Sequence, residues 1–325
     1  MVTDKQRILV TGGSGYIGAR LSLYLADAGY AVIPLCYPTI PNSPEWCAKM
    51  ERVATGDIRD EDYLRALSKQ EDFDIIIHLV SLDHGKSAGN PSVVAGVNIT
   101  PVWSLLDIFS RVGVKKFIYF STMQIYGLLS SEHITEQYIP QTRNAYALTH
   151  WIGEQICEHY NRNSDLQCRS IRLSNSYGAP VFMENNCWWL VVNDLCRMAY
   201  QKQKILLQSD GTPQRDFIHG WDVCRAVESI ITTEADYTTY NISTGSTLTI
   251  AEIAQAVQEV YRERYSRQIP ILGPDLTDVD IQSVSSRYVI DNSRLKSIGF
   301  QPEWSLRRGI HDLFDYLEQH VEASI

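Results

Sequence analysis

A glycine-rich stretch near the N-terminus constrains the fold of this chain more than any other feature. Residues 11–18 read Thr-Gly-Gly-Ser-Gly-Tyr-Ile-Gly and contain the pattern GxGxxG. The stretch directly follows a short β-branched run at 7–11 and directly precedes an amphipathic segment at 16–28. Glycines in this context allow a tight turn, a close approach of the backbone to phosphates and close packing of a helix on a strand. The stretch therefore predicts a strand, a turn and a helix whose N-terminus binds the pyrophosphate of a nicotinamide dinucleotide. The residues expected to contact this cofactor are Gly12, Gly15, Tyr16, Ile17 and Gly18.

Short apolar runs alternate with amphipathic stretches through the first half of the chain. The expected strands span residues 7–11, 31–36, 52–55, 75–80, 116–121 and 168–173. Strands that alternate with helices form βαβ units, in which the strands run parallel and the helices cover both faces of the sheet. We therefore expect an α/β fold with a doubly wound parallel sheet.

The alternation ends near residue 177, where the sequence Gly-Ala-Pro signals a turn. Residues 1–177 are predicted to form the dinucleotide-binding domain, and residues 178–325 a smaller substrate lobe. Helical patterns in this lobe cover residues 188–200, 250–265 and 306–321. A segment near 205–245 is expected to return to the first domain, because residues 239–243 read as one more strand. The two parts are therefore predicted to be interleaved.

Composition limits the partners and the compartment. The net charge is -9 and no Lys/Arg cluster interrupts it, so nucleic acid is not an expected partner. The seven cysteines include no CxxC pair and are typical of reduced thiols in a cytoplasmic protein. No segment reaches the roughly 18 uninterrupted apolar residues of a membrane helix, so no membrane association is expected. Neither His78 nor His84 has a partner at ligand spacing, and we expect no metal site.

The end of the second predicted strand leaves the type of dinucleotide open. An Asp or Glu at this position binds the adenosine ribose hydroxyls and disfavours a 2′-phosphate. This chain has Cys36 there, followed by Tyr37, and no adjacent arginine to attract a 2′-phosphate. The cofactor is therefore predicted to be NAD or NADP, without a choice between them.

Further motifs carry a resemblance to a known family. They are Ser-Thr-Met-Gln-Ile-Tyr-Gly at 121–127, Tyr-Ala-Leu-Thr-His at 146–150, Arg-Leu-Ser-Asn-Ser-Tyr-Gly at 172–178 and Gln-Arg-Asp-Phe-Ile-His at 214–219. With these motifs the chain resembles the extended short-chain dehydrogenases/reductases that act on nucleotide sugars, and the likeness spans most of its length. The resemblance implies a Rossmann fold and a nucleotide-sugar substrate. It also implies cofactor contacts from residues in two similar segments and a helix: Asp57, Ile58, Leu79, Val80, Ser81 and Asn98.

Tyr146 is the candidate acid or base for hydride transfer at a sugar carbon. A free tyrosine has a pKa of about 10, so a phenolate at neutral pH needs stabilising charge nearby. In the family a lysine four residues on provides much of it, but this chain has His150, which also remains a candidate for binding the nicotinamide ribose. Histidine is largely neutral at pH 7. Three interpretations stay open: a working enzyme with altered pH dependence, a cofactor-binding protein that catalyses poorly, and an engineered or incidental change.

Thr122 occupies the place where the family has a Ser or Thr that hydrogen-bonds the reacting sugar oxygen, although a role as a strand-end cap is the alternative. Met123 and Gln124 follow it, where the 4,6-dehydratases of the family carry Asp and Glu. Neither Met nor Gln can act as the acid or base that eliminates water. Dehydration of that type is therefore not expected.

The resemblance also implies substrate contacts. Asn175 and Arg215 match residues that bind the diphosphate, unless Asn175 forms a turn and Arg215 pairs with Asp216. The segment at 184–189 is expected near the nucleotide, and its two tryptophans stack on a base or belong to the core. The remaining candidates for substrate contact, each of them alternatively a surface or core residue, are Asp83, His84, Met123 and Asn186.

These residues favour an NAD(P)-dependent enzyme that exchanges hydride with a ring carbon of a nucleoside-diphosphate sugar, expected to be C4. Epimerase and dehydrogenase or ketoreductase activities stay open. A non-catalytic nucleotide-binding protein and a reductase of a non-sugar carbonyl are the alternatives. The resemblance further implies a homodimer formed through the helices at 102–111 and 147–160.

Overall fold

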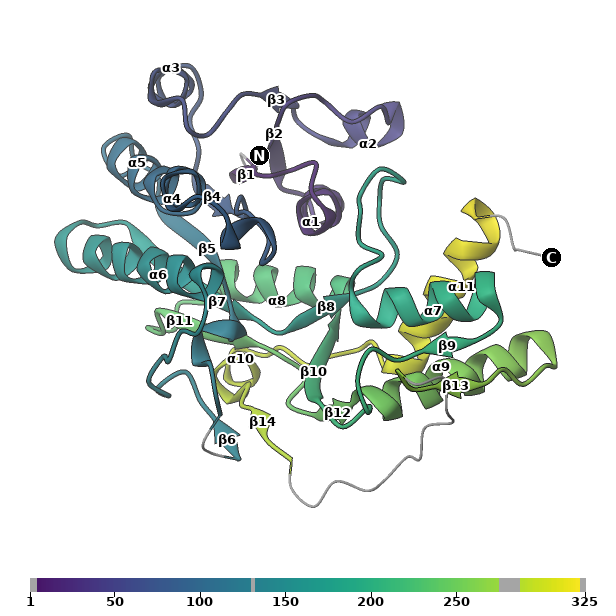
Figure 1. Cartoon of the computed structure of the whole chain (residues 1–325). Coiled ribbons are helices and arrows are strands. Elements are labelled where there is room, and N and C mark those ends of the chain that lie inside the picture. Colours follow the sequence, from purple (N-terminus) through teal and green to yellow (C-terminus); the bar gives the residue numbers. More distant parts are fainter. Residues whose placement is uncertain (1–4, 130–131, 275–286, 322–325) are drawn as a thin grey trace.

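Seven strands form one parallel sheet in the order β11-β7-β5-β4-β1-β2-β3 (Figure 1). The computed structural model describes residues 5–129, 132–274 and 287–321. The strands of this sheet are β1 (Arg7–Thr11), β2 (Ala31–Cys36), β3 (Ala54–Thr55), β4 (Ile75–His78), β5 (Lys116–Thr122), β7 (Gln167–Leu173) and β11 (Thr239–Ile242). Every adjacent pair runs parallel, which confirms the predicted doubly wound sheet.

Successive residues of each central strand enter separate cores on the two faces of the sheet. Ile8 and Val10 pack with α1 (Tyr16–Asp27) and α8 (Gly220–Thr232). Leu9, between them, packs with the helices of the opposite layer, which are α3 (Glu61–Gln70), α5 (Thr100–Phe109) and α6 (Ala145–Asn163). Both helical layers are visible in Figure 1. Because both faces are covered, the central strands β1, β2 and β4 are apolar along most of their length.

The C-terminal half builds a further core, separate from the two cores on the faces of the large sheet. Helices α7 (Val191–Lys202), α9 (Ile250–Tyr265) and α11 (Leu306–His320) pack together around Phe217. A second sheet joins β8 (Asn175–Tyr177), β10 (Gln214–His219) and β12 (Thr247–Thr249). The expected start of α7 at residue 188 is wrong: Leu190 has extended backbone and is the N-cap, so both tryptophans precede the helix.

The chain crosses between the two halves more than once. Strand β9 (Ile205–Leu206) pairs with β13 (Ile271–Leu272) in the C-terminal half, whereas β11 pairs with β7 at the edge of the large sheet. Helix α8 packs on α1. Of the lobe proposed from the sequence, residues 275–286 and 322–325 lie outside the described part of the chain.

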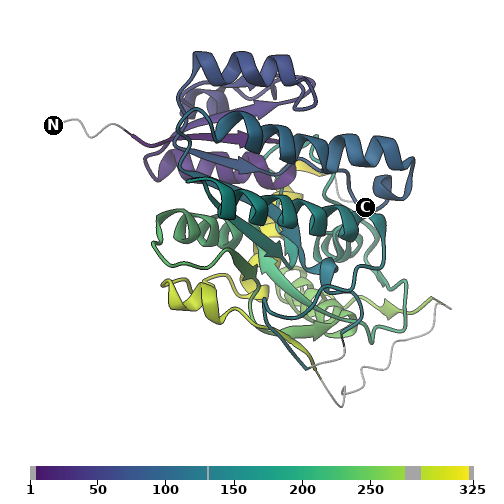
Figure 2. The ribbon, with the colours of Figure 1, turned by 90° about the vertical axis from the view of Figure 1, so that its left-hand side faces the viewer.

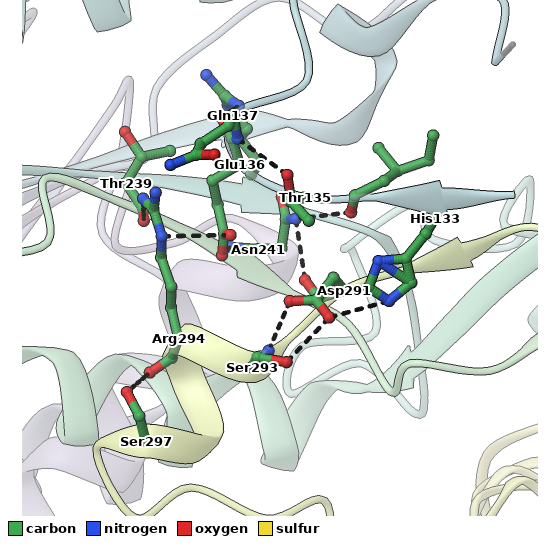
Figure 3. A network of polar contacts seen from close by, with 12 residues as sticks. His133, Thr135, Glu136, Gln137, Thr239, Asn241, Asp291, Ser293, Arg294 and Ser297 are labelled. Atoms are coloured by element: carbon green, nitrogen blue, oxygen red, sulfur yellow. Dashed lines mark hydrogen bonds and ion pairs between the residues drawn. The ribbon is translucent and has the colours of Figure 1, made fainter. Parts of the chain in front are cut away.

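Segments far apart in the sequence meet at a polar network beside β11 (Figure 3). Strand β6 (His133–Ile134) pairs with β14 (Val289–Ile290). Next to this strand pair, His133 Nε2 lies 3.2 Å from Asp291 Oδ2, and the Asn241 side chain donates to the Asp291 carbonyl. Glu136 accepts from the Asn241 backbone N–H at 2.9 Å and pairs with Arg294 at 3.4 Å. The network fixes the loop before α6 against the large sheet.

One described helical stretch, Pro91–Phe109, is long and apolar enough to cross a membrane by length and composition alone. It comprises α4 (Pro91–Asn98) and α5, and half of its most apolar window is buried inside the fold. Helix α5 packs against α3 and α6, as a core helix does. Asn98, Ser104 and Asp107 interrupt this stretch, so it does not contradict the prediction that no uninterrupted apolar segment of membrane length is present.

A buried ion pair attaches α6 to the large sheet. Arg172, near the end of β7, donates from Nε and Nη2 to the Glu154 carboxylate, with the shortest contact at 2.7 Å, and both side chains are 4% exposed. Its Nη1 donates to the Tyr126 hydroxyl and to the Glu136 carbonyl. The guanidinium is thus fully used, and α6 is held in one position.

Substitution of Arg172 by Met should destabilise the fold by about 3–5 kcal/mol, because the Glu154 carboxylate is then buried without a cation. Urea denaturation of the variant and the native protein measures this difference. The double variant Arg172→Met/Glu154→Leu should recover at least half of the loss, because no buried charge remains. A loss below about 1 kcal/mol in the single variant would show that the pair is not the anchor of α6.

Candidate active site

A continuous cleft lies at the carboxyl ends of the strands, where the strand order reverses between β1 and β4. Three adjoining cavities form it. The adenosine-side cavity, of about 540 Å³, and the central cavity, of about 380 Å³, share Gly12, Gly15 and Ser81. The outer cavity, of about 1100 Å³, shares Met123 and Asn175 with the central one. A long bipartite ligand, or two ligands end to end, can therefore occupy the cleft.

The glycine-rich turn has the form that a pyrophosphate requires. Gly12 has a φ of +73°, and a Cβ on Gly18 would lie 2.1 Å from the Gly12 carbonyl oxygen. Helix α1 therefore starts directly on the turn. Its N-cap, Gly15, makes no side-chain capping hydrogen bond, so N–H groups of the first turn remain available to an anion. All five predicted residues of the turn line the cavities, and they fit a nicotinamide dinucleotide.

At the adenosine side, Asp57, Ile58 and Tyr37 line the cavity. Asp57 is paired with Arg59, whose Nε donates to Oδ1 at 2.9 Å, and this guanidinium lowers the pKa of Asp57. The predicted contact of the Cys36 side chain with the cofactor is wrong. This side chain is 0% exposed and lies in the core between α1 and the sheet. Strand alternation turns Cys36 inward, and the next residue, Tyr37, faces the cavity instead.

Asn98 supports the cleft without lining it. Its side chain is 2% exposed, and its Oδ1 accepts from the backbone N–H of Leu82 at 2.8 Å. Its Nδ2 donates to the Thr149 hydroxyl at 3.0 Å. The prediction that Asn98 contacts the cofactor directly is therefore wrong. Asn98 instead joins the loop after β4 to α6. The predicted cofactor residues of that loop, Leu79, Val80 and Ser81, line the cleft.

Tyr146 lines the central cavity. It lies on the first turn of α6, beside Thr122 at the end of β5. The pKa of Tyr146 is raised to about 12, because burial disfavours the phenolate. A hydrogen bond with the Thr122 hydroxyl lowers the pKa and the charge of Asp83 raises it. In the protein alone, Tyr146 is therefore a protonated phenol at neutral pH.

His150 lies one turn further along α6, with its ring centroid 4.2 Å from that of Tyr146. Its Nδ1 lies 2.8 Å from the Tyr146 carbonyl oxygen, and since a carbonyl only accepts, Nδ1 carries the proton. Burial lowers the pKa of His150 to about 4, although this hydrogen bond raises it. The ring is thus neutral at pH 7, and its free Nε2 is an acceptor. His150 is 2% exposed and does not line the cavities, so the predicted contact of its side chain with the nicotinamide ribose is not seen in this geometry.

The outer cavity collects the predicted substrate residues. They are Asp83, His84, Met123, Asn175, Asn186 and Arg215. Asn175 donates from Nδ2 to the Asp216 carbonyl at 2.9 Å. Arg215 donates to the Gln214 carbonyl and does not pair with Asp216, whose carboxylate is instead bound by Ser174 and Thr244. The guanidinium of Arg215, which also contacts Tyr288, therefore has no anionic partner in the described part of the chain.

The two tryptophans before α7 differ in their surroundings. Trp189 is 65% exposed, lines both the central and the outer cavity, and donates from Nε1 to the Asn186 carbonyl at 2.9 Å. Trp188 packs against the core of the C-terminal half, with its ring 6.0 Å from that of Tyr316. Only Trp189 is placed to stack on a ligand.

Sequence reasoning did not assign several residues that line the cleft. They are Gln124, Arg143 and Tyr288. Gln124 and Arg143 flank Thr122 and Tyr146 in the sequence, and this proximity was the available signal. Tyr288 is far from every motif, and only the tertiary fold brings it here. In the part of the chain that the structure describes, no group of three or more His, Cys, Asp or Glu side chains can hold a metal ion.

A glycine-rich dinucleotide turn, a phenol beside it and a second large cavity beyond define an oxidoreductase-type enzyme with a Rossmann fold. The chain belongs to the NAD dependent epimerase/dehydratase family, whose model it matches over residues 8–243. The enzymes of this family act on nucleotide sugars, as the sequence motifs imply.

Characterised relatives cover almost the whole chain. A UDP-glucose 4-epimerase of Rhizobium meliloti is 27% identical over 93% of this chain and 94% of its own. A dTDP-D-glucose 4,6-dehydratase of Mus musculus is 23% identical over 97% of this chain and 89% of its own. The structure of a UDP-glucose 4-epimerase with UDP-glucose, from Thermotoga maritima, superimposes with a TM-score of 0.83 at 24% identity, covering 98% and 100% of the two chains.

Replacement of His150 by Lys should lower the pKa of Tyr146 by about 2 units, because an ammonium roughly 6 Å away stabilises the phenolate by about 3 kcal/mol. Carbon-13 NMR of labelled tyrosine, with the Tyr146 signal identified from Tyr146→Phe, follows the titration. His150→Gln is the matched neutral control and should leave the pKa near that of the native protein. An unchanged pKa in His150→Lys would contradict the assignment of His150 as an uncharged neighbour.

Proposed function

We propose that this protein is a nucleoside-diphosphate-sugar 4-epimerase that uses NAD. One observation carries the proposal: Tyr146, beside Thr122, lines the central cavity, which adjoins the 1100 Å³ cavity with Asn175 and Arg215. The 27% identical relative that bears the name UDP-glucose 4-epimerase supports it. A dehydrogenase or ketoreductase on the same substrates is the alternative, and it differs in the net oxidation of the product.

Tyr146 and Thr122 hold and move the proton at the sugar C4 oxygen. The Thr122 hydroxyl positions that oxygen, and the Tyr146 phenol oxygen exchanges the proton with it. The bound cofactor supplies the hydride acceptor and a positive charge on its nicotinamide ring. Because His150 is neutral, Tyr146 depends on charge that arrives with its ligands.

Residues after β5 separate epimerisation from dehydration. Elimination of water needs an acid and a base beside the sugar, and Met123 and Gln124 provide neither. Met123 instead contacts Asn175, whose Nδ2 lies 3.6 Å from its sulfur. The site therefore supports proton exchange at one oxygen only, which favours the epimerase over the dehydratases among the relatives.

The adenosine-side cavity favours NAD over NADP. Arg59 is the arginine on this side, and the Asp57 carboxylate already neutralises it. A 2′-phosphate would therefore bring two negative charges to a cavity without an unpaired arginine among its lining residues. Tyr37, which is 57% exposed, offers a ring and a hydroxyl to the adenosine instead.

Incubation of the protein with NAD and UDP-galactose should give UDP-glucose without accumulation of reduced cofactor, as measured by proton NMR and nicotinamide absorbance. Tyr146→Phe should lower the rate by about 100-fold or more, because the proton at the C4 oxygen has no acceptor. NAD affinity should stay within a few-fold of the native value. An equal rate in Tyr146→Phe, or binding of no nucleotide sugar at all, would overturn the proposal.

A homodimer through α5 and α6 accounts for the apolar side chains on these helices. We propose that two copies pair these helices into a four-helix bundle. Trp103 on α5 is 57% exposed, Leu148 on α6 is 46% exposed and Val93 on α4 is 55% exposed. Figure 2 shows the two helices lying side by side on the outside of the molecule. Exposed apolar groups gathered on one face are typical of an interface.

Trp103→Glu should convert the dimer into a monomer, because a carboxylate would be buried at the centre of the bundle. Sedimentation equilibrium measures the molecular mass. Trp189→Glu is the matched control, since Trp189 is similarly exposed but lines the cleft, and this variant should remain dimeric. A native protein that is monomeric at all concentrations would refute the interface.

A further inference from the structure

The outer cavity is lined by more positive charge than a diphosphate bound at one end of the cavity would neutralise. Asp83 is the only carboxylate among its described lining residues, and Lys86 neutralises it with a contact of 3.4 Å. Two guanidiniums remain, those of Arg143 and Arg215, and neither forms an ion pair. An unpaired guanidinium in a cavity is a site for an anion, which it can bind with two parallel hydrogen bonds.

The two arginines come from different walls. Arg215 lies on β10, beside Tyr288, and the neighbouring residue on that strand, Asp216, accepts from Asn175 through its carbonyl. This wall offers a cation, an amide and a phenol. Asn175 and Arg215 on this wall are the residues that the sequence resemblance assigns to the diphosphate.

Arg143 belongs to the wall that carries the reacting group. It directly precedes Asn144, the N-cap of α6, and lies three residues before Tyr146. The Asn144 side chain donates to Gln124 Oε1 at 3.5 Å, which joins this loop to the end of β5 two residues beyond Thr122. Arg143 makes no hydrogen bond or ion pair with any residue that the structure describes. Arg143 therefore brings to the outer cavity a charge without an internal partner.

We propose that Arg143 binds a carboxylate on the sugar, so that the substrate is a nucleoside-diphosphate uronic acid. The inference rests on the proposed function and adds the class of sugar to it. A neutral hexose would offer this guanidinium no charge-assisted hydrogen bond. A uronate carboxylate matches the planar fork of arginine.

Calorimetric titration of the protein saturated with NAD tests the proposal with three probes, UDP, UDP-glucose and UDP-glucuronate. The native protein should bind UDP-glucuronate about tenfold tighter than UDP-glucose or more, the effect of one charge-assisted contact. Arg143→Gln should abolish this difference and leave the affinities for UDP and UDP-glucose within about threefold. Arg143→Lys keeps the charge without the fork and should retain part of the preference.

Arg215→Gln is the matched control on the opposite wall, and it should weaken all three probes together. Equal affinities of the native protein for the two sugars would overturn the uronate and leave the epimerase proposal standing. Weakening of all three probes by Arg143→Gln would also overturn it, because Arg143 would then be a diphosphate contact. Binding of none of the probes by the native protein would overturn both proposals. Arg143 is exposed, so its variants should keep the native melting temperature, which thermal unfolding checks.

Discussion

The attachment of α6 to the large sheet is the constraint on which the site depends. The Arg172–Glu154 pair is one part of it, and a close approach is the other: a Cβ on Gly153 would lie 2.3 Å from the Tyr119 hydroxyl. The helix therefore lies directly on β5 and β7. Its first turn carries Tyr146 and its second His150, so the depth at which the helix sits decides how far both side chains are removed from water. Burial of the phenol and of the imidazole follows from this packing rather than from any special contact at the site.

That burial has an electrostatic consequence. Low polarity raises the pKa of Tyr146 and lowers that of His150, so the pair is neutral at pH 7. A lysine at position 150 would add a charge of its own, whereas this histidine contributes an acceptor nitrogen. Stabilisation of a phenolate therefore has to come from the bound dinucleotide, and Tyr146 stays protonated until the cofactor is bound. Thr122 remains as the one neighbour that favours the ionised form.

Sequence patterns predicted the sheet because each strand follows a rule that is local to it. Ile8, Leu9 and Val10 are apolar since both faces are covered, and the glycines at 12 and 18 mark the turn that no other residue permits. The residues that line the dinucleotide cavities could be assigned for the same reason, as they follow strands directly. Cys36 and Asn98 were assigned to the cofactor by their position in the sequence alone. The direction of a buried side chain and its hydrogen bonds depend on the tertiary structure, so these two assignments failed. Arg143 and Tyr288 were missed because their neighbours in space lie far off in the sequence.

The cleft separates its charges along its length. At the adenosine side the cation is already paired, at the centre Tyr146 and His150 are neutral, and in the outer cavity two guanidiniums have no ion-pair partner. A ligand that carries its charge at one end only would leave one of these guanidiniums without an anion. A nucleoside-diphosphate uronic acid carries negative charge at the diphosphate and again at the far side of the sugar, with the neutral ring between. Its two negative charges match the two guanidiniums of the outer cavity, and the neutral ring between them leaves C4 for proton exchange with Tyr146.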